Sequence, residues 1–263
     1  MQASAAPLSP EKNLAAIRAA AVSSRANGAE LLITPELFVT GYEPAALAEW
    51  MTPDRLAHFP QQLAQIAFET RISLVASFPS QTRDGNYAIT AGFWDADAGM
   101  MLHYEKVHLW GPVERAAFTP SKVSPRVASW HGRRVGLQIC YDIEFAEPAR
   151  YLAAQGADLL LVPTAINADS EYIPDVLVRA RAAENNVIVA YADYPATNAE
   201  GNTTEFAGKS IVAGVEGSVL AQAGRGETLL FAEIPDEQAA QPADYLRDRR
   251  PDIYLRWATG TVD

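Results

Sequence analysis

The feature that most constrains the fold is a block of sequence that occurs twice. Residues 28–35, Gly-Ala-Glu-Leu-Leu-Ile-Thr-Pro, match residues 156–163, Gly-Ala-Asp-Leu-Leu-Leu-Val-Pro, in order, spacing and polarity. Each block is a short apolar run that ends at a proline, which is typical of a strand buried on both faces. The match predicts that the chain contains two structurally equivalent halves.

The elements predicted around the two blocks also follow one order. A helix precedes each block, and a second helix, a strand and a pair of strands follow it. The predicted helices cover about 10–25, 53–69, 148–155 and 175–185, and the predicted strands about 72–77, 87–94, 100–105, 187–192 and a pair around Glu216-Gly217. Each half therefore reads α-β-α-β-β-β.

This order predicts an α/β fold, a four-layer α-β-β-α sandwich with an internal pseudo-twofold duplication. The 263 residues, 49% of them hydrophobic, are enough for one large domain or two fused halves. A strand over 134–139 precedes the second half, whereas the first half opens almost at once with its helix. We therefore expect a truncated first strand. Residues 1–234 should form the domain, and residues 235–263 an extension that packs on it or on a partner subunit.

Composition limits the partners and the location. The net charge of −11 argues against nucleic acid and anionic membranes as partners, because both would repel the chain. One cysteine cannot form an intrachain disulfide or a CxxC redox pair. No apolar run is long enough to cross a bilayer, and residues 1–4 lack the features of a signal peptide. We expect a cytoplasmic protein without nucleotide or metal cofactors; His103 and His108 have no third ligand nearby.

Cys140 is the residue around which a reactive site would form. It follows the apolar strand 134–139 and precedes a helix, so its thiol should be held rigidly at the rim where ligands collect. The alternative is that a lone cysteine is a small core residue. A catalytic thiol also needs a base and an oxyanion donor, and the backbone N–H of Tyr141 is a natural donor because it follows the nucleophile.

Two further residues stand at strand ends and could supply these functions. Glu36 follows a buried strand and Pro35, where a carboxylate is costly unless it has a partner or a task. Lys106 stands at the end of the strand 100–105. Either could instead be an ordinary surface residue. Together with a cysteine they would suit acyl transfer, with Glu as base, Lys as oxyanion partner and Cys as nucleophile.

Three segments resemble the signatures of the nitrilase (carbon–nitrogen hydrolase) superfamily and occur in its order. They are Thr34-Pro35-Glu36-Leu37 with Gly41-Tyr42, 104–110 (Tyr-Glu-Lys-Val-His-Leu-Trp) with Glu114-Arg115, and 138–147 (Gln-Ile-Cys-Tyr-Asp-Ile-Glu-Phe-Ala-Glu). The similarity continues through 162–165 and 179–185. The resemblance implies the four-layer sandwich and a Glu36–Lys106–Cys140 triad without metal, with Glu114 beside the lysine. It also implies a homodimer or larger homo-oligomer, with 145–152 and the C-terminal segment as candidate contacts.

The resemblance implies hydrolysis of a small amide, with ammonia as leaving group. The Cys-Tyr-Asp start of the third segment is similar to carboxamidases, and 140–145 is closest to bacterial R-stereoselective amidases. Glu144 stands where omega-amidases typically have arginine, and an acid there should favour a neutral or aminated amide over a dicarboxylate monoamide. Omega-amidase, nitrilase or N-carbamoyl hydrolase activity are alternatives, as is a non-catalytic binding protein.

Several loop residues near the strand ends are candidates for the walls of the substrate pocket, although each could equally fill the core or face solvent. Beside Glu144, these candidates are Tyr42, Trp110, Tyr141, Phe145, Asn167 and Tyr172.

Overall fold

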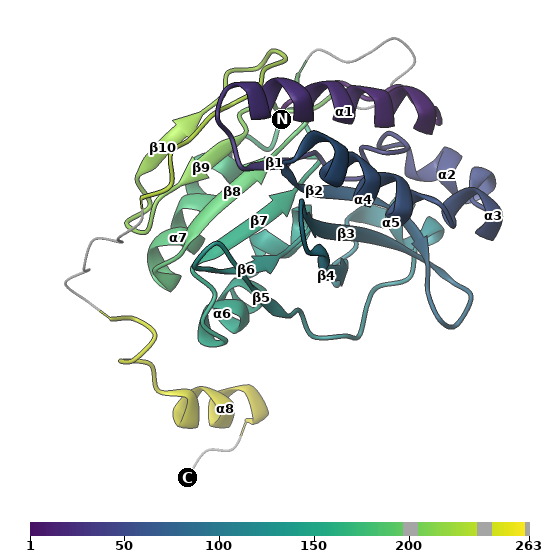
Figure 1. Cartoon of the computed structure of the whole chain (residues 1–263). Coiled ribbons are helices and arrows are strands. Elements are labelled where there is room, and N and C mark those ends of the chain that lie inside the picture. The colour runs from purple at the N-terminus through teal and green to yellow at the C-terminus, as the bar shows by residue number, and fades with distance from the viewer. Residues whose placement is uncertain (197–204, 236–243, 261–263) are drawn as a thin grey trace.

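We describe the protein from a computed structural model, which covers residues 1–196, 205–235 and 244–260. The first half of the chain contributes a four-stranded sheet in the order β1-β2-β3-β4 (Figure 1). β1 pairs with β2 in parallel, and the other pairs are antiparallel. These strands are β1 (Leu31–Ile33), β2 (Ser73–Gln81), β3 (Tyr87–Asp95) and β4 (Gly99–Glu105).

The second half contributes a six-stranded sheet in the order β10-β9-β8-β7-β6-β5. β6, β7 and β8 run in parallel, and the remaining pairs are antiparallel. The strands are β5 (Val127–Trp130), β6 (Arg133–Leu137), β7 (Leu159–Pro163), β8 (Ile188–Ala192), β9 (Ile211–Ala213) and β10 (Val219–Gln222). β7 and β8 are buried along their whole length, as the apolar runs predicted.

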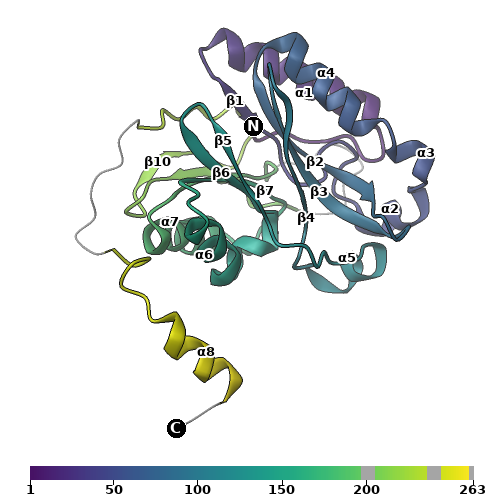
Figure 2. The ribbon, with the colours of Figure 1, turned by 60° about the horizontal axis from the view of Figure 1, so that its bottom comes forward.

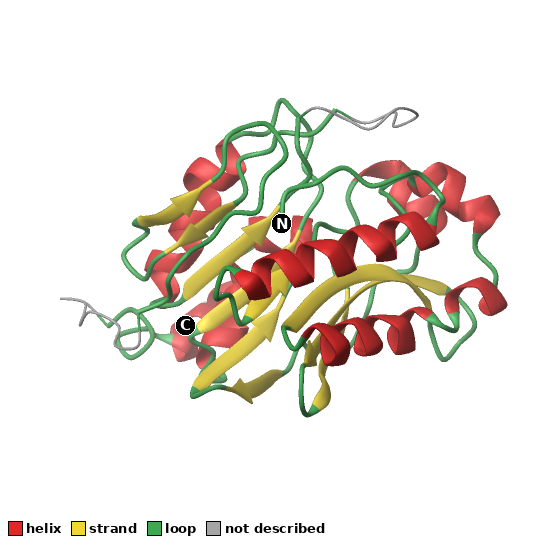
Figure 3. Cartoon of the chain, turned by 45° about the horizontal axis from the view of Figure 1, so that its top comes forward, coloured by secondary structure: helices red, strands yellow, loops and turns green. Residues whose placement is uncertain are grey.

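The two sheets face each other, and helices cover their outer faces (Figures 1 and 2). α1 (Pro10–Ala26) and α4 (Phe59–Thr70) cover the first sheet, while α6 (Ala146–Ala154) and α7 (Arg179–Asn185) cover the second (Figure 3). The inner faces form one continuous apolar core. The predicted four-layer sandwich is confirmed, and β1 and β7 occupy equivalent places in the two halves.

The structure corrects two local predictions in the first half. The single helix predicted over 53–69 is two helices, α3 (Pro53–Leu56) and α4, because Pro60 lacks an N–H and cannot continue the preceding turn. The segment between Gly41 and residue 53, where no helix was predicted, contains α2 (Pro44–Trp50), which begins at a proline, a favourable residue for a first helical position. Gly41 has φ +79° and packs against the backbone of Pro7.

The C-terminal extension ends in α8 (Pro251–Thr259), which projects from the sandwich (Figures 1 and 2). None of its residues is buried, and Leu255 and Trp257 are about 70% exposed. Leu246, before the helix, packs against the domain core. In the described residues, no helix combines the length and apolar character needed to cross a membrane.

Candidate active site

Glu36 lies three residues beyond the end of β1, at the point where the first sheet meets the second half. Its side chain is fully buried. Its backbone N–H donates to the carbonyl of Thr164 (3.0 Å), and its carbonyl accepts from the hydroxyl of Tyr194 (2.7 Å). Both partners follow strands of the second sheet. The carboxylate therefore comes from the first half of the chain but is held in place by the second.

Lys106 follows β4 directly and is also fully buried. Its Nζ donates to Oε1 of Glu36 at 2.7 Å and to both carboxylate oxygens of Glu114 at 2.9 Å. A buried ammonium is stable only when it is paired in this way. The predicted meeting of Glu36, Lys106 and Glu114 is thus present in the structure, with the lysine between two carboxylates.

Glu114 lies on α5 (Gly111–Ala117), whose first turn follows the lysine segment. Its Oε1 also accepts from the hydroxyl of Tyr42 (2.6 Å), and its Oε2 accepts from the backbone N–H of Trp110 (2.7 Å). Each oxygen of this buried carboxylate therefore accepts more than one hydrogen bond. Such a carboxylate has little freedom to move, and it fixes the position of the Lys106 ammonium.

Cys140 opens a 3-10 turn, Cys140–Glu144, and does not follow the strand directly as predicted, since β6 stops at Leu137. Its φ is +48°, a left-handed conformation that is uncommon for a residue with a side chain. The thiol Sγ lies 3.7 Å from the carbonyl oxygen of Ala165, and the Glu36 side chain is near enough for an interaction with Cys140 to lower the pKa of that carboxyl against the larger effect of burial. Strain of this kind persists where the surroundings fix it, commonly at functional sites.

Burial sets the protonation states of the cluster. It raises the pKa of Glu36 to about 8, against the opposing effect of Lys106 and with help from the charge of Glu114. Burial alone would lower the pKa of Lys106, but the two carboxylates raise it above its ordinary value, so this side chain is an ammonium. Burial and the carboxylates raise the pKa of the Cys140 thiol. Proton transfer from the thiol therefore needs a nearby base, and Glu36 is within reach.

Asp142 is a positioning residue that the sequence analysis did not single out. Its Oδ2 accepts from the Tyr104 hydroxyl (2.8 Å) and the Ile139 N–H (3.2 Å), and its Oδ1 accepts from the His108 N–H (2.9 Å) and lies 2.8 Å from His108 Nδ1. Tyr104 and His108 flank the buried lysine in sequence. Asp142 thereby ties the lysine segment to the turn that carries Cys140.

Glu144 closes the same turn and is half-buried. Burial raises its pKa to about 7, while the charge of Lys106 acts in the opposite direction. Arg181, on α7, donates to the carbonyls of Ile143 (3.0 Å) and Glu144 (2.7 Å). These two hydrogen bonds hold the turn against α7, and they involve the backbone of Glu144 rather than its carboxylate.

The other predicted pocket residues divide into two groups. Tyr42 is buried in the cluster, and Tyr141 packs edge-on against Phe145 at 4.9 Å between ring centroids. Asn167 forms an isolated antiparallel bridge with Phe206, whose ring packs at 6.1 Å from that of Tyr42. By contrast, the side chains of Trp110 and Tyr172 are 43% and 55% exposed, and the structure does not bring them into the cluster.

The sandwich brings Glu36, Lys106 and Cys140 into one buried cluster, and the comparison with known families identifies the class of protein. Residues 1–243 match the carbon-nitrogen hydrolase family. The chain belongs to this family and is a hydrolase that acts on carbon–nitrogen bonds. Across the ranges that the structure describes, no cluster of three or more His, Cys, Asp or Glu side chains could hold a metal ion.

The chain is also similar to individual characterised or solved proteins. A hydrolase encoded near pqqF in Pseudomonas protegens is 34% identical over 89% of this chain and 82% of its own length. An (R)-stereoselective amidase from a Pseudomonas species is 31% identical over 88% of this chain and 83% of its own length. The crystal structure of an amidase from Nesterenkonia superposes with a TM-score of 0.91 at 39% identity, covering 98% of this chain and 94% of that one.

Proposed function

We propose that the protein is an amidase that hydrolyses a small carboxamide to a carboxylic acid and ammonia through a thioester on Cys140. The observation that carries the proposal is the buried Lys106 ammonium, held between Glu36 and Glu114 beside a thiol in a left-handed conformation. A fixed cation next to a nucleophile can stabilise an oxyanion without reorganising during the reaction.

In the first half of the reaction, Glu36 takes the proton of the Cys140 thiol as Sγ attacks the amide carbon. The C–S bond forms, and the carbonyl oxygen becomes an oxyanion stabilised by the Lys106 ammonium and the backbone N–H of Tyr141. The proton on Glu36 then passes to the amide nitrogen. The C–N bond breaks, ammonia leaves, and the thioester remains.

In the second half, Glu36 takes a proton from water as the water oxygen attacks the thioester carbon. The oxyanion forms again in the same position and collapses by breaking the C–S bond. The proton on Glu36 returns to the Cys140 sulfur, which restores the free enzyme. A pKa near 8 suits a group that must accept and release a proton in each half-reaction.

Variant structures of the Nesterenkonia amidase support this assignment. A glutamate and a cysteine are substituted in its complex with acrylamide, and their separation in sequence equals that between Glu36 and Cys140. In another variant, the acetamide moiety of fluoroacetamide is attached covalently to the active-site cysteine. A complex with butyramide shows that this relative binds a small aliphatic amide.

Ammonia release from a panel of amides, nitriles and carbamoyl compounds tests the proposal. We expect turnover of small amides and none by Cys140→Ala, with Val123→Ala, an exposed loop variant, as active control. Fluoroacetamide should label the protein once, and the intact mass identifies the site because Cys140 is the only cysteine. Turnover of nitriles or carbamoyl compounds alone, or full activity of Cys140→Ala, would refute the proposal.

Glu144 supports a preference for an amino-substituted or neutral amide. Its carboxyl is half-buried, burial raises its pKa to about 7, and the charge of Lys106 acts on it in the opposite direction, so its ionised form can pair with a substrate ammonium. We expect prolinamide to be preferred over 2-oxoglutaramate, and Glu144→Gln to reduce the ratio of kcat/KM for prolinamide to that for butyramide. A clear preference for 2-oxoglutaramate would contradict this specificity while leaving the amidase assignment intact.

We also propose that the extension 235–263 packs on a second copy of the chain. Leu255 and Trp257 expose apolar side chains on a helix that has no buried residue. Tyr151, on α6 and within the predicted contact 145–152, is 42% exposed. Analytical ultracentrifugation should show a homo-oligomer that Trp257→Asp dissociates. A monomeric parent chain would refute this.

A further inference from the structure

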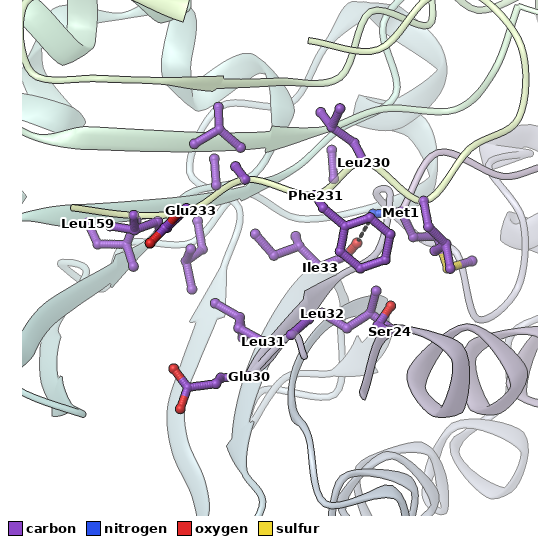
Figure 4. Close-up of a pocket in the computed structure, with 18 of the residues that line it drawn as sticks. Met1, Ser24, Glu30, Leu31, Leu32, Ile33, Leu159, Leu230, Phe231 and Glu233 are labelled. Carbon is purple, nitrogen blue, oxygen red and sulfur yellow. Dashed lines mark hydrogen bonds between the residues drawn. The ribbon is translucent and has the colours of Figure 1, made fainter. Parts of the chain in front are cut away.

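The two repeated blocks of the sequence meet at the centre of the sandwich. β1 and β7, the strands that they form, contact each other, and Leu31–Ile33 and Leu159 line the same cavity of about 710 Å³ (Figure 4). Each block ends at a proline, and the residues that follow the two prolines, Glu36 and Thr164, are therefore counterparts. They also meet in space, since the Glu36 N–H donates to the Thr164 carbonyl at 3.0 Å. The duplication thus brings one residue from each half to the same place in the core.

Thr164 is fully buried, and its surroundings fix it beside the nucleophile. Its N–H donates to the carbonyl of Ala192 at 2.9 Å, and its side-chain Oγ1 lies 2.9 Å from the hydroxyl oxygen of Tyr191. The carbonyl of the next residue, Ala165, lies 3.7 Å from Cys140 Sγ. The peptide that carries Thr164 is therefore held next to the sulfur.

The Thr164 side chain acts on the ionisation of the nucleophile. Burial raises the pKa of the Cys140 thiol, whereas an interaction with the Thr164 side chain lowers it. A hydroxyl favours a neighbouring thiolate by donating a hydrogen bond to it. The Ala165 carbonyl can only accept, so its contact with Sγ favours the protonated thiol. Thr164 and Ala165 thus favour opposite protonation states of the same sulfur.

Tyr191 extends this contact away from the sulfur. It lies on β8, where it pairs with Val162 of β7, and its side chain is buried. Burial and the charge of Cys140 raise the pKa of the Tyr191 phenol well above its usual range, so the phenol keeps its proton. Thr164 and Tyr191 both carry hydroxyls, so the hydrogen bond between them can run in either direction.

We propose that Thr164 and Tyr191 form a hydroxyl relay that stabilises the Cys140 sulfur while it carries negative charge. As Glu36 takes the thiol proton, Tyr191 donates to Thr164, and Thr164 donates to Sγ. Once the C–S bond has formed, the thioester sulfur is a weak acceptor, and the Thr164 hydroxyl donates to Tyr191 instead. Only the O–H bonds rotate, and no proton leaves either hydroxyl. The relay rests on the thioester mechanism proposed above.

The relay favours the reacting state over the resting state. A hydrogen bond to an ionised acceptor is about twice as strong as one between neutral groups. The relay therefore stabilises the thiolate more than the thiol or the thioester, and only such differential stabilisation speeds the chemical step. Thr164 contacts the reacting sulfur and is a catalytic residue in this proposal, whereas Tyr191 acts through it and is a positioning residue. Neither adds a charge to the cluster of Glu36, Lys106 and Glu114.

The test measures the reactivity of the sulfur directly, through alkylation of Cys140 by iodoacetamide, which intact mass reports because the chain has one cysteine. Thr164→Val keeps the shape of the side chain but removes the hydroxyl. We expect its alkylation rate at pH 7 and its kcat/KM for butyramide to fall about 10- to 100-fold, as for a lost hydrogen bond to a charged group. Thr164→Ser, which keeps the hydroxyl, should stay within about threefold of the parent chain. Tyr191→Phe should lower both rates about 3- to 10-fold.

Two further measurements separate a relay from a loss of packing. In the Thr164→Val background, Tyr191→Phe should have no further effect on either rate, because the Tyr191 hydroxyl acts through Thr164. The acid limb of the pH profile of kcat/KM, which follows Glu36 in the proposed mechanism, should keep its midpoint in Thr164→Val. Tyr87→Phe is the matched control, since it removes a hydroxyl that donates to the Met51 carbonyl (3.4 Å) in the first half, and it should leave both rates unchanged.

Several outcomes would overturn the relay. These are equal alkylation rates for Thr164→Val and Thr164→Ser, an unchanged alkylation rate in Tyr191→Phe, and losses from the two hydroxyl deletions that multiply in the double variant. A moved acid limb in Thr164→Val would also overturn it, because the substitution would then act by disturbing Glu36. Absence of amide turnover by the parent chain would instead refute the proposed function, while the alkylation rates would still test the relay.

Discussion

The charge of Glu114 should control the pH at which the enzyme becomes active. The mechanism that we propose requires the base form of Glu36, and burial raises the pKa of this carboxyl to about 8, with Glu114 adding to that shift. We therefore expect kcat/KM to rise tenfold per pH unit below about pH 8. In Glu114→Gln, the neighbouring negative charge is gone, so Glu36 ionises more easily and the acid limb of the profile moves to lower pH.

The size of this shift follows from the geometry at Lys106. The two carboxylates contact the same Nζ at 2.7 and 2.9 Å, so these oxygens lie no more than about 5.6 Å apart. Two unit charges at that distance interact by about 3 kcal/mol at an effective dielectric constant of about 20, which corresponds to about 2 pKa units. The reorganisation of Lys106 around one remaining carboxylate reduces this, and we expect a shift of about 1 to 2 units.

The assay is the pH dependence of kcat/KM for a neutral amide such as butyramide, because its own charge does not change. Tyr42→Phe is the matched control, since it removes a 2.6 Å hydrogen bond to Glu114 but no charge. Its acid limb should stay close to that of the parent. An unmoved limb in Glu114→Gln, a shift to higher pH, or an equal shift in Tyr42→Phe would refute the electrostatic reasoning.

Three further predictions concern stability. Native Glu36 keeps its proton up to about pH 8, whereas in the unfolded chain this carboxyl loses its proton near pH 4.5. The contribution of Glu36 to stability therefore falls as pH rises between these values. The gain in Tm from Glu36→Gln should be larger at pH 8 than at pH 5, and a constant gain would contradict this. Asp142→Asn should lower the free energy of unfolding by about 1–3 kcal/mol in denaturant unfolding. The amide nitrogen that replaces one carboxylate oxygen cannot accept the hydrogen bonds made there, whether from Tyr104 and Ile139 or from His108. Gly92→Ala should cost about 1–3 kcal/mol or more, since a Cβ would lie 2.3 Å from the Trp94 ring, and a loss below 0.5 kcal/mol would show that the ring can move aside.

The repeat made the architecture predictable from sequence. Residues 28–35 and 156–163 became β1 and β7 with the loops that follow them, and the parallel order around them gave the two sheets. Element boundaries were less predictable. Pro60 divides a run whose hydrophobic spacing reads as one helix, and the short helix after Glu43 has too few residues to show a clear period.

The sequence predicted which residues form the candidate cluster, and the structure brings Glu36, Lys106 and Glu114 together, but the conformation of Cys140 was not predictable. Its residues follow the ends of strands, and both their positions in the sequence and the family resemblance indicated them as candidates. The left-handed backbone of Cys140 is fixed by its surroundings rather than by local preference, so no local pattern indicates it. The role of Asp142 was equally hidden, because a carboxylate in a polar turn reads as solvated until Tyr104 and His108 are seen to converge on it.

The way Glu36 is held also has a consequence for how activity is acquired during folding. The first sheet can form its own ladders without the second, but the Glu36 backbone reaches its position only when Thr164 and Tyr194 are in place. A partly folded chain with native secondary structure in one half would therefore lack the base that we propose. Recovery of amide turnover after dilution from denaturant should lag behind recovery of the far-ultraviolet circular dichroism signal, which makes catalysis a reporter of the docking of the two halves.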